Sequence, residues 1–219
     1  MNPVYSDVIV WLPTFNEEMN IVKMITDIRA LGFQVRVTDG GSSDNTVALA
    51  KSTGVDVHLR PGEHKGYGIQ RAMEESVKAG YRKLIYIDCD QTYPVLKLPE
   101  LYAMAEANDM AVGARDFSKI VFLNRMANYF FTGLINLFFQ ARLSDTQSGM
   151  RIILLDKFAG HIRSNEFDLE TEFTCFALKH GMRVKELPVD YYKRVGKSKT
   201  SVRQAFLIVR RIFICRFAK

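Results

Sequence analysis

Cysteine is scarce in this chain of 219 residues, which contains only Cys89, Cys175 and Cys215. The three are scattered, no C-x-x-C pair occurs, and no histidines stand at the spacing of a zinc site. Neither a disulfide framework nor a structural zinc site is therefore predicted. Isolated cysteines are typical of a reducing compartment, where thiols stay free, so we expect a cytoplasmic location.

Long uninterrupted apolar runs are also missing. The longest apolar tract, residues 120–139, is broken by Asn124, Arg125, Asn128 and Asn136. Charged and amide groups are costly inside a bilayer, so we expect no membrane-spanning helix. The first residues lack a basic region followed by an apolar core, and no secretory signal is predicted.

Acidic residues are absent from the stretch Tyr191 to Lys219, which carries nine Lys or Arg. The remainder of the chain has 21 basic and 24 acidic residues, so the formal net charge of +6 arises in this tail. A basic tail can bind nucleic acid, an anionic membrane surface or a phosphorylated substrate, and charge alone does not choose among them.

What the first half does contain is an alternation of short apolar runs with segments of helical periodicity. This alternation predicts an α/β fold whose mostly parallel sheet has helices on both faces. Strands are predicted at Val8–Leu12, Val35–Thr38, Val55–Leu59 and Lys83–Ile87, and helices at Glu17–Leu31, Asn45–Ser52 and Ile69–Lys78. Ligands of such sheets bind outside the carboxyl ends of the strands, so the polar residues after each apolar run form the candidate site.

The second half is less regular. Its pattern predicts a long helix at Lys119–Arg142, a short strand at Ile152–Leu154, a helix at Glu170–Lys179, paired extended segments at Arg183–Glu186 and Val189–Lys193, and a basic helix at Ser201–Phe217. Neither an internal repeat nor a low-complexity linker separates the halves. We therefore predict one domain with a soft boundary near Ala114.

The strongest local signal is the pair Asp88 and Asp90, two carboxylates two residues apart where an apolar strand stops. Residues two apart in a strand point to the same side, so both carboxylates can face one Mg²⁺ or Mn²⁺ ion. Such an ion would in turn neutralise a diphosphate. Taken alone, the motif is more often an ordinary turn or helix cap.

Polar residues also follow the first two predicted strands. Asn16 and Glu17 come after the first, and Asp39-Gly40-Gly41-Ser42-Ser43-Asp44 follows the second. Glycine lets the backbone approach a ligand closely, Asp39 can accept hydrogen bonds from a base or ribose, and Asp44 or Asn45 is expected to cap the next helix. The stretch Gly66-Tyr67-Gly68-Ile69-Gln70-Arg71 begins like a dinucleotide fingerprint, but it ends in arginine and follows a charged loop, which argues against a dehydrogenase.

Together these motifs resemble the family 2 glycosyltransferases of GT-A fold, and within them the dolichyl-phosphate mannose and glucose synthases. The resemblance runs in order from about Val8 to Lys199. It is carried by Leu12-Pro13-Thr14-Phe15-Asn16-Glu17, Asp39-Gly40-Gly41-Ser42-Ser43-Asp44, Asp88-Cys89-Asp90 with Thr92-Tyr93-Pro94, Asp145-Thr146-Gln147-Ser148-Gly149-Met150-Arg151, and Tyr191-Tyr192-Lys193-Arg194-Val195-Gly196-Lys197-Ser198-Lys199. Each motif is weak singly, whereas five in order are a strong signal.

The resemblance implies a metal-dependent, inverting transfer of mannose or glucose from GDP-mannose or UDP-glucose to a polyprenyl (dolichyl) phosphate, with Mg²⁺ or Mn²⁺ as cofactor. Residues 1–114 would bind the nucleotide and 115–200 the acceptor, ahead of a basic amphipathic helix at 201–219. The implied nucleotide-sugar-binding residues are Pro13, Asn16, Glu17, Asp39, Asp88 and Arg115, and the implied metal ligands are Asp88 and Asp90. The implied catalytic residues are Asp90, Asp145, Arg151, Arg194 and Lys199, where the basic side chains, like Arg115, would contact phosphate groups.

Two of these residues carry qualifications. Some relatives have a glutamine metal ligand two residues after the second aspartate, where this chain has Thr92, with glutamine at Gln91 instead. Asp145 would orient the acceptor or the sugar hydroxyls, but a turn residue before Ser148 and Gly149 explains it equally well. A lipid phosphate is already ionised near neutral pH, which fits the lack of a Ser-His-Asp or Cys-His arrangement.

Two predicted helices are amphipathic. In the helix after Lys119, polar residues recur every four positions and leave a broad apolar face, and the final basic helix has a similar apolar side. Basic amphipathic helices suit an anionic bilayer surface, so we expect peripheral binding to the cytoplasmic face of a membrane. The commoner outcome for such helices is that they cover the sheet as ordinary core.

Other functions stay possible from the sequence. A transferase with a sugar acceptor would share these motifs. A nucleotidyltransferase would share the architecture, but it is expected to carry a glycine-rich loop with a basic residue where this chain has Pro13 to Glu17. A nucleic-acid-binding module is disfavoured because the basic tail mixes Phe and Ile in apolar blocks, so no nucleic-acid partner is predicted.

Overall fold

The computed structural model describes residues 5–60, 62, 64–193 and 202–218. Within them the strands are β1 Val8–Thr14, β2 Gln34–Asp39, β3 Val57–Leu59, β4 Lys83–Ile87, β5 Met110–Arg115, β6 Met150–Leu154 and β7 Val184–Val189. The α-helices are α1 Ile21–Ala30, α2 Thr46–Ser52, α3 Lys65–Lys78, α4 Leu98–Met104, α5 Phe122–Phe139, α6 Leu155–Phe158, α7 Leu169–Lys179 and α8 Val202–Phe217, with two 3-10 helices, η1 Val95–Lys97 and η2 Phe117–Lys119.

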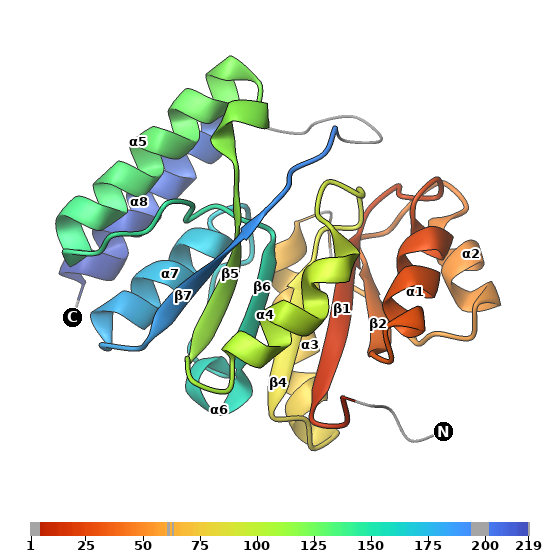
Figure 1. Ribbon diagram of the computed structural model, residues 1–219. Helices are drawn as coiled ribbons and strands as arrows, with labels where there is room; N and C mark the ends of the chain where they lie inside the picture. Colours follow the sequence, from red (N-terminus) through yellow and green to blue (C-terminus); the bar gives the residue numbers. More distant parts are fainter. Residues whose placement is uncertain (1–4, 61, 63, 194–201, 219) are drawn as a thin grey trace.

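The strands form one mixed sheet in the order β3-β2-β1-β4-β6-β5-β7 (Figure 1). All neighbouring pairs are parallel except those of β6, which runs antiparallel to β4 and to β5. The predicted mostly parallel α/β sheet is therefore confirmed. Because β6 is reversed, its first residue, Met150, lies opposite Ile87 at the carboxyl end of β4.

The central strands are buried on both faces, which explains their nearly continuous apolar sequences. Every residue of β1 and β4 is buried. One face of the sheet packs against α1, α2 and α4 in a core that includes Ile25, Ala50 and Leu101. The other face packs against α3, α6 and α7, as the ribbon also shows (Figure 1). The predicted helices on both faces are confirmed.

A third apolar cluster joins α5 and α8 to α7. The long helix α5 and the final helix α8 lie side by side at one end of the sheet (Figure 1). Phe131 and Ile135 of α5 and Ile212 of α8 are buried in this cluster. No helix in the described ranges is long and apolar enough to cross a membrane.

Several predicted boundaries differ from the structure. Helix α1 begins at Ile21 instead of Glu17, because residues 16–20 form a loop that hydrogen-bonds to the loop after β2. Helix α3 begins four residues earlier than predicted, at Lys65. A Cβ at Gly66 would lie 2.4 Å from the backbone of Ser164, so the glycine in its first turn permits close packing.

The prediction of paired extended segments after Arg183 is wrong. A single strand, β7, runs from Val184 to Val189 and pairs in parallel with β5. Pro188 lies within this strand, and because β7 is an edge strand its missing N–H is tolerated. Strand β5, which was not predicted, contains the soft boundary drawn near Ala114, so both halves of the chain share one sheet.

Candidate functional site

The carboxyl ends of β1, β2, β4 and β5 bring the predicted polar loops to one edge of the sheet. Thr14 of β1 lies opposite Asp39 of β2, and Asp88 follows the last residue of β4. The antiparallel strand β6 adds Ser148 and Gly149, which directly precede it, and Arg115 ends β5. This edge is the place where ligands of open α/β sheets bind.

Asp39 lies beneath the loop after β2 and is fully buried. Its Oδ1 accepts hydrogen bonds from the N–H groups of Gly41 (3.0 Å) and Ser42 (2.8 Å). Its Oδ2 accepts from the hydroxyls of Thr14 (3.0 Å) and Ser42 (2.6 Å). Because both oxygens are used inside the protein, Asp39 shapes the loop, and the expected direct contact with a nucleoside is not favoured by this arrangement.

The loops after β1 and β2 are tied to each other. Asn16, whose φ is 55°, accepts a hydrogen bond from the N–H of Ser43 at 2.8 Å and donates its own N–H to Ser42 Oγ at 2.8 Å. The N–H of Glu17 donates to Thr46 Oγ1 at 2.7 Å. Pro13 is buried within β1. Asn16 is exposed at the surface of this double loop and Glu17 is half-buried, whereas Pro13 is buried in the strand that leads into the loop.

Asp44 accepts the N–H of Thr46, the first residue of α2, at 2.9 Å and that of Glu18 at 3.2 Å. Burial by itself raises the pKa of Asp44, but hydrogen bonds from the Thr46 hydroxyl and from these two N–H groups outweigh it and lower the pKa overall. Asp44, and not the side chain of Asn45, makes the predicted contact with the start of α2.

Asp88 is held between a lysine and a glycine. Its Oδ1 accepts from Lys65 Nζ at 2.9 Å, and its backbone N–H donates to the carbonyl of Gly149 at 3.1 Å. A Cβ at Gly149 would lie 2.0 Å from Asp88 Oδ2. Gly149 thus leaves space that the Asp88 carboxylate occupies, which explains a glycine at the start of β6.

Lys65, the first residue of α3, also forms an ion pair with Glu170 of α7. Burial alone lowers the pKa of Lys65, but Asp88 and Glu170 more than offset this and raise the pKa overall. Lys65 and Glu170 were not predicted, because α3 and α7 are far apart in sequence and neither residue belongs to a recognisable motif.

Asp90 is buried, and its Oδ1 accepts from the N–H of Thr92 at 3.1 Å and from the Thr92 hydroxyl at 2.5 Å. Thr92 therefore orients Asp90 through its side chain. Gln91, with a φ of 59°, donates its amide to Asn20 Oδ1 at 2.7 Å. The Thr92 hydroxyl and the Gln91 amide are thus both engaged in hydrogen bonds within the protein.

Arg115 and Asp145 form a buried bidentate ion pair. Arg115 Nε lies 2.6 Å from Asp145 Oδ2, and Nη2 lies 2.9 Å from Oδ1. Burial alone lowers the pKa of Arg115, but Tyr93 and Asp145 raise it overall. The two residues were predicted to contact phosphate and acceptor separately, and the structure instead pairs them with each other.

Arg151 lies inside the protein. It is fully buried, and its guanidinium donates to the carbonyls of Thr146 (2.7 Å) and Ser148 (3.0 Å) and to Thr174 Oγ1 (2.9 Å). These hydrogen bonds are all made within the protein, and they do not favour the expected contact with a phosphate. Arg151 holds the segment that carries Asp145 and Gly149 in place.

The segment after β7 approaches the same edge. The N–H of Tyr192 donates to the Thr92 carbonyl at 2.9 Å. The ring of Tyr191 lies 5.5 Å from that of Tyr93 and 5.3 Å from the Arg115 guanidinium. Tyr191 and Tyr192 therefore lie beside the loop that follows Asp90. Arg194 and Lys199, two of the predicted phosphate contacts, lie outside the described residues.

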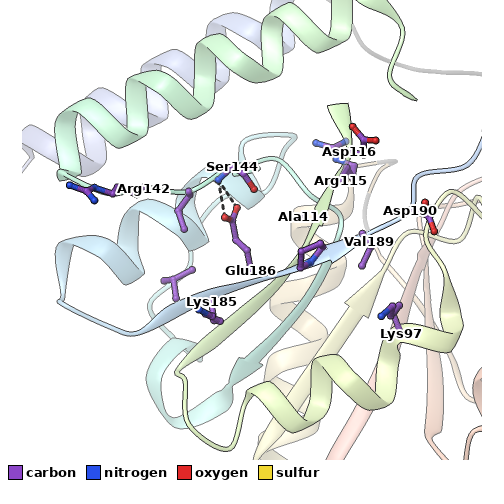
Figure 2. Close-up of a pocket in the computed structure, with 13 residues that line it drawn as sticks. Lys97, Ala114, Arg115, Asp116, Arg142, Ser144, Lys185, Glu186, Val189 and Asp190 are labelled. Carbon is purple, nitrogen blue, oxygen red and sulfur yellow. Dashed lines mark hydrogen bonds between the residues drawn. The ribbon is translucent and has the colours of Figure 1, made fainter. Parts of the chain in front are cut away.

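A cavity of ≈ 750 Å³ lies next to Arg115, along β7 and the connection between α5 and β6 (Figure 2). Lys97, Arg142 and Lys185 contribute positive charge to its lining. Figure 2 shows Glu186 reaching from β7 to Ser144, whose N–H donates to both carboxylate oxygens at 2.8 and 2.9 Å. Most of the lining belongs to residues 115–200, which were predicted to bind the acceptor, and Lys97 and Ala114 come from the other part.

The carboxylates of Asp88 and Asp90 fit a hard divalent cation by their chemistry. Within the ranges that the structure describes, no three His, Cys, Asp or Glu side chains form a ready-made metal cluster. Mg²⁺ sites in nucleotide enzymes commonly use one or two carboxylates, with waters and substrate phosphates completing the shell. Two aspartates beside an open edge match that kind of site.

Comparisons with known proteins place these features in a family. The profile of Glycosyl transferase family 2 matches residues 9–163. The glycosyltransferase AglJ of Haloferax volcanii is 30% identical over 207 residues, which cover 91% of this chain and 68% of that protein. A dolichyl-phosphate hexose transferase of the same organism is 29% identical, with 89% of this chain and 87% of that protein covered.

Solved structures with the same fold include glucosyl-3-phosphoglycerate synthase from Mycobacterium tuberculosis. Its complex with Mg²⁺ and uridine diphosphate has a TM-score of 0.77 at 16% identity and covers 95% of this chain and 79% of that one. Its complex with Mn²⁺ and UDP-glucose has a TM-score of 0.75 at 17% identity, with 95% and 78% covered. The GT-A fold expected from the sequence is thereby confirmed.

Proposed function

This chain belongs to glycosyl transferase family 2, and from that membership we propose that it transfers a hexose from a nucleotide sugar to a polyprenyl phosphate. The observation that carries the proposal is the placement of Asp88, Asp90 and the Asn16–Ser43 double loop after the carboxyl ends of the neighbouring parallel strands β4, β1 and β2. Similarity to a dolichyl-phosphate hexose transferase over most of both chains supports the lipid acceptor.

On the donor side, the double loop binds the nucleoside and the two aspartates face the diphosphate. Asn16 offers an exposed side chain and Glu17 a half-buried one, and the glycines of the Asp39–Asp44 segment let backbone N–H groups approach a ligand. Asp39 contributes by fixing this loop through its four hydrogen bonds. The donor is GDP-mannose or UDP-glucose.

Asp88 and Asp90 hold a divalent cation, Mg²⁺ or Mn²⁺, in this proposal. Bound there, the cation would neutralise charge on the departing nucleoside diphosphate. The protein orients the two ligands differently. Thr92 donates two hydrogen bonds to Asp90, whereas Asp88 contacts Lys65 through Oδ1 and occupies the space beside Gly149 with Oδ2.

The transfer itself is a single displacement. An oxygen of the lipid phosphate attacks the anomeric carbon, a bond forms between them, and the bond from that carbon to the diphosphate oxygen breaks, which inverts the configuration. The phosphate is already ionised at neutral pH, so no strong general base is required. The chain therefore acts mainly by positioning and charge neutralisation. Arg194 and Lys199 are proposed as contacts for the acceptor phosphate.

The Arg115–Asp145 pair lies at the acceptor side of the edge, next to the aromatic ring of Tyr191. Because each residue satisfies the other, we assign the pair a positioning role: it fixes the end of β5 and the loop before β6, between which the acceptor would enter. This role replaces separate contacts of Arg115 and Asp145 with substrate.

Membrane docking at the cytoplasmic face is the second part of the proposal. Helix α5 exposes Phe122, Leu123, Met126, Phe130 and Leu137, although Phe131, which the sequence placed on the same face, is buried. Helix α8 exposes Phe206, Phe213 and Phe217, interspersed with the exposed Arg203, Arg210 and Arg216. Exposed aromatic residues mixed with arginine suit an anionic bilayer surface, where a polyprenyl phosphate resides.

The experiment that tests the transfer incubates the full chain with Mn²⁺, a panel of nucleotide sugars, and either polyprenyl phosphate or free sugars as acceptors. Products are identified by mass spectrometry. We expect one hexosyl polyprenyl phosphate from UDP-glucose or GDP-mannose. Transfer to a free sugar alone would replace the lipid acceptor, and no transfer from any donor would contradict the assignment.

Membrane docking is tested by sedimentation with anionic and neutral vesicles. We expect binding to phosphatidylglycerol vesicles that weakens in high salt and is reduced in Phe206→Ser. Leu59→Ser is the matched control, because Leu59 of β3 is 70% exposed and Phe206 is 69% exposed, yet β3 lies at the opposite end of the sheet. Equal loss of binding in both variants, or no binding by the unmodified chain, would refute docking through α8.

A further inference from the structure

Lys65 lies where a positive charge is costly. Its side chain is 18% exposed and lies at the first position of α3. Cations are unfavourable at a helix N-terminus, where the helix dipole is positive, and burial adds a desolvation cost. An apolar side chain of similar length would fill the same space without either cost. The charge at this position therefore has a use that packing does not explain.

The two partners of Lys65 come from separate parts of the site. Asp88 is a proposed metal ligand whose side chain is 31% exposed, and Lys65 Nζ contacts its Oδ1 at 2.9 Å. Glu170, in the first turn of α7, is 6% exposed and forms an ion pair with the same Nζ. Glu170 faces the interior and Asp88 faces the open edge, so Glu170 anchors the lysine and Lys65 presents its charge to Asp88.

The surroundings keep this arrangement in place. Gln70, one turn and a half along α3, donates to the carbonyl of Ser164 at 2.9 Å and to Asn165 Oδ1 at 2.6 Å. Gly66 packs so closely against the same segment that a Cβ has no room. The start of α3 is therefore fixed against the loop that leads into α7, which sets Lys65 next to both carboxylates.

We propose that Lys65, anchored by Glu170, is a positioning residue that makes metal binding at Asp88 depend on the nucleotide diphosphate. The inference rests on the proposed metal-dependent transfer. A divalent cation that approaches Asp88 alone is repelled by the ammonium group already paired with that carboxylate. A diphosphate brings negative charge that offsets Lys65, so the cation and nucleotide bind together more tightly than the cation alone.

The magnitude follows from Coulomb's law. A divalent and a monovalent charge about 6 Å apart interact, even at the dielectric constant of water, by an amount equivalent to about a tenfold change in affinity. Removing the ammonium group should therefore tighten the binding of Mn²⁺ alone by at least about tenfold. Removing the negative charge of Glu170 should weaken the binding of Mn²⁺ alone, because Lys65 then pairs with Asp88 alone.

The test measures Mn²⁺ binding to the full chain by the electron paramagnetic resonance signal of the free ion, with and without uridine or guanosine diphosphate. We expect Lys65→Met to bind Mn²⁺ alone about tenfold more tightly and to lose most of the enhancement by nucleotide. Glu170→Gln should bind Mn²⁺ alone several-fold more weakly. Lys65→Arg, which keeps the charge, should retain most of the enhancement.

Lys83→Met is the matched control. Lys83 is also a buried lysine paired with two carboxylates, Asp7 and Glu106, but it lies at the other end of β4, about 16 Å from Asp88 at the usual rise of a strand. Its removal should leave Mn²⁺ affinity unchanged. Unchanged or weaker Mn²⁺ binding in a folded Lys65→Met would overturn the inference and leave the transferase assignment intact.

Two other outcomes are equally decisive. If the thermal transition shows that Lys65→Met is unfolded, Glu170→Gln replaces it in the test, with weaker instead of tighter Mn²⁺ binding expected. Unchanged Mn²⁺ binding in Glu170→Gln overturns the inference. If the unmodified chain binds no Mn²⁺ even with nucleotide, the metal site itself is refuted, and the inference falls with it.

Discussion

Gly149 offers a direct way to displace the Asp88 carboxylate without changing any charge. The φ of Gly149 lies outside the left-handed region, so alanine can adopt its backbone conformation. The added Cβ would lie 2.0 Å from Asp88 Oδ2 and 2.4 Å from its Cγ. Since Cβ contacts below 3.0 Å essentially do not occur, Oδ2 must move by at least 1.0 Å.

The backbone of Gly149 cannot easily move instead. Its N–H donates to the buried hydroxyl of Tyr93 at 2.8 Å, and its carbonyl accepts the N–H of Asp88 at 3.1 Å. The preceding hydroxyl of Ser148 donates to the Gly113 carbonyl at 2.6 Å. The Asp88 side chain, with one face open, is therefore the group that yields.

A displacement of about 1 Å at a reacting group can lower turnover by about 100-fold. We expect Gly149→Ala to reduce kcat/KM for hexosyl transfer by roughly that factor and to weaken Mn²⁺ binding in the presence of nucleotide. Gly133→Ala is the matched control, because Gly133 lies within α5 with nothing within 4 Å of an added Cβ. That variant should keep its activity and gain about 0.5–1 kcal/mol of stability.

The assay combines steady-state transfer, Mn²⁺ binding and thermal unfolding of both variants. A Gly149→Ala protein that melts near the temperature of the unmodified chain but has lost transfer supports the reasoning. If such a protein keeps both its kcat/KM and its Mn²⁺ affinity, the Asp88 carboxylate does not need its present position and the reasoning is refuted.

Three further predictions concern stability and are measured by urea unfolding. Asp145→Asn leaves Arg115 buried without its counter-charge and should cost about 3–5 kcal/mol; a loss below about 1 kcal/mol would mean that water reaches the pair. Gly66→Ala meets the backbone of Ser164 and should cost about 1–3 kcal/mol from overpacking, whereas no loss would show that the start of α3 is mobile. The pKa of Asp44 is lowered in the folded protein, so its contribution is present above its ordinary pKa of about 3.9 and is lost as pH falls through the lower folded value. Asp44→Asn should therefore make the free energy of unfolding depend less on pH in that acidic range. An unchanged pH dependence there would contradict this role of Asp44.

The fold was predictable where the sequence pattern is local. Strand β4, Lys83–Ile87, was predicted at its observed bounds because five apolar or buried residues end in a charged motif. Strand β5 was missed because Met110–Arg115 contains Gly113, which weakens the sequence pattern of a strand. That β7 is one strand was not predicted, because it contains Pro188 and proline normally interrupts a strand. Nothing in the sequence indicates that β7 lies at the edge of the sheet, where proline is tolerated.

The candidate site was predictable where a motif follows a strand, as with Asp88 and Asp90. It was not predictable where a charged residue is buried by partners from elsewhere in the chain. The family resemblance implied a phosphate contact for Arg151, yet three carbonyl and hydroxyl oxygens accept its hydrogen bonds in the interior. Lys65 meets Glu170 only after α3 and α7 have packed on the same face of the sheet.

The measurement that tests the central claim most directly is the Mn²⁺-dependent formation of hexosyl polyprenyl phosphate by Asp90→Asn and by Asp156→Asn. Asp90 is buried beside the edge of the sheet, whereas Asp156 lies on α6 with an exposed side chain. Each substitution removes one carboxylate charge. The account predicts that Asp90→Asn loses glycolipid formation while Asp156→Asn forms product at the rate of the unmodified chain. Full activity of a folded Asp90→Asn would contradict the claim that this aspartate serves the departing nucleotide.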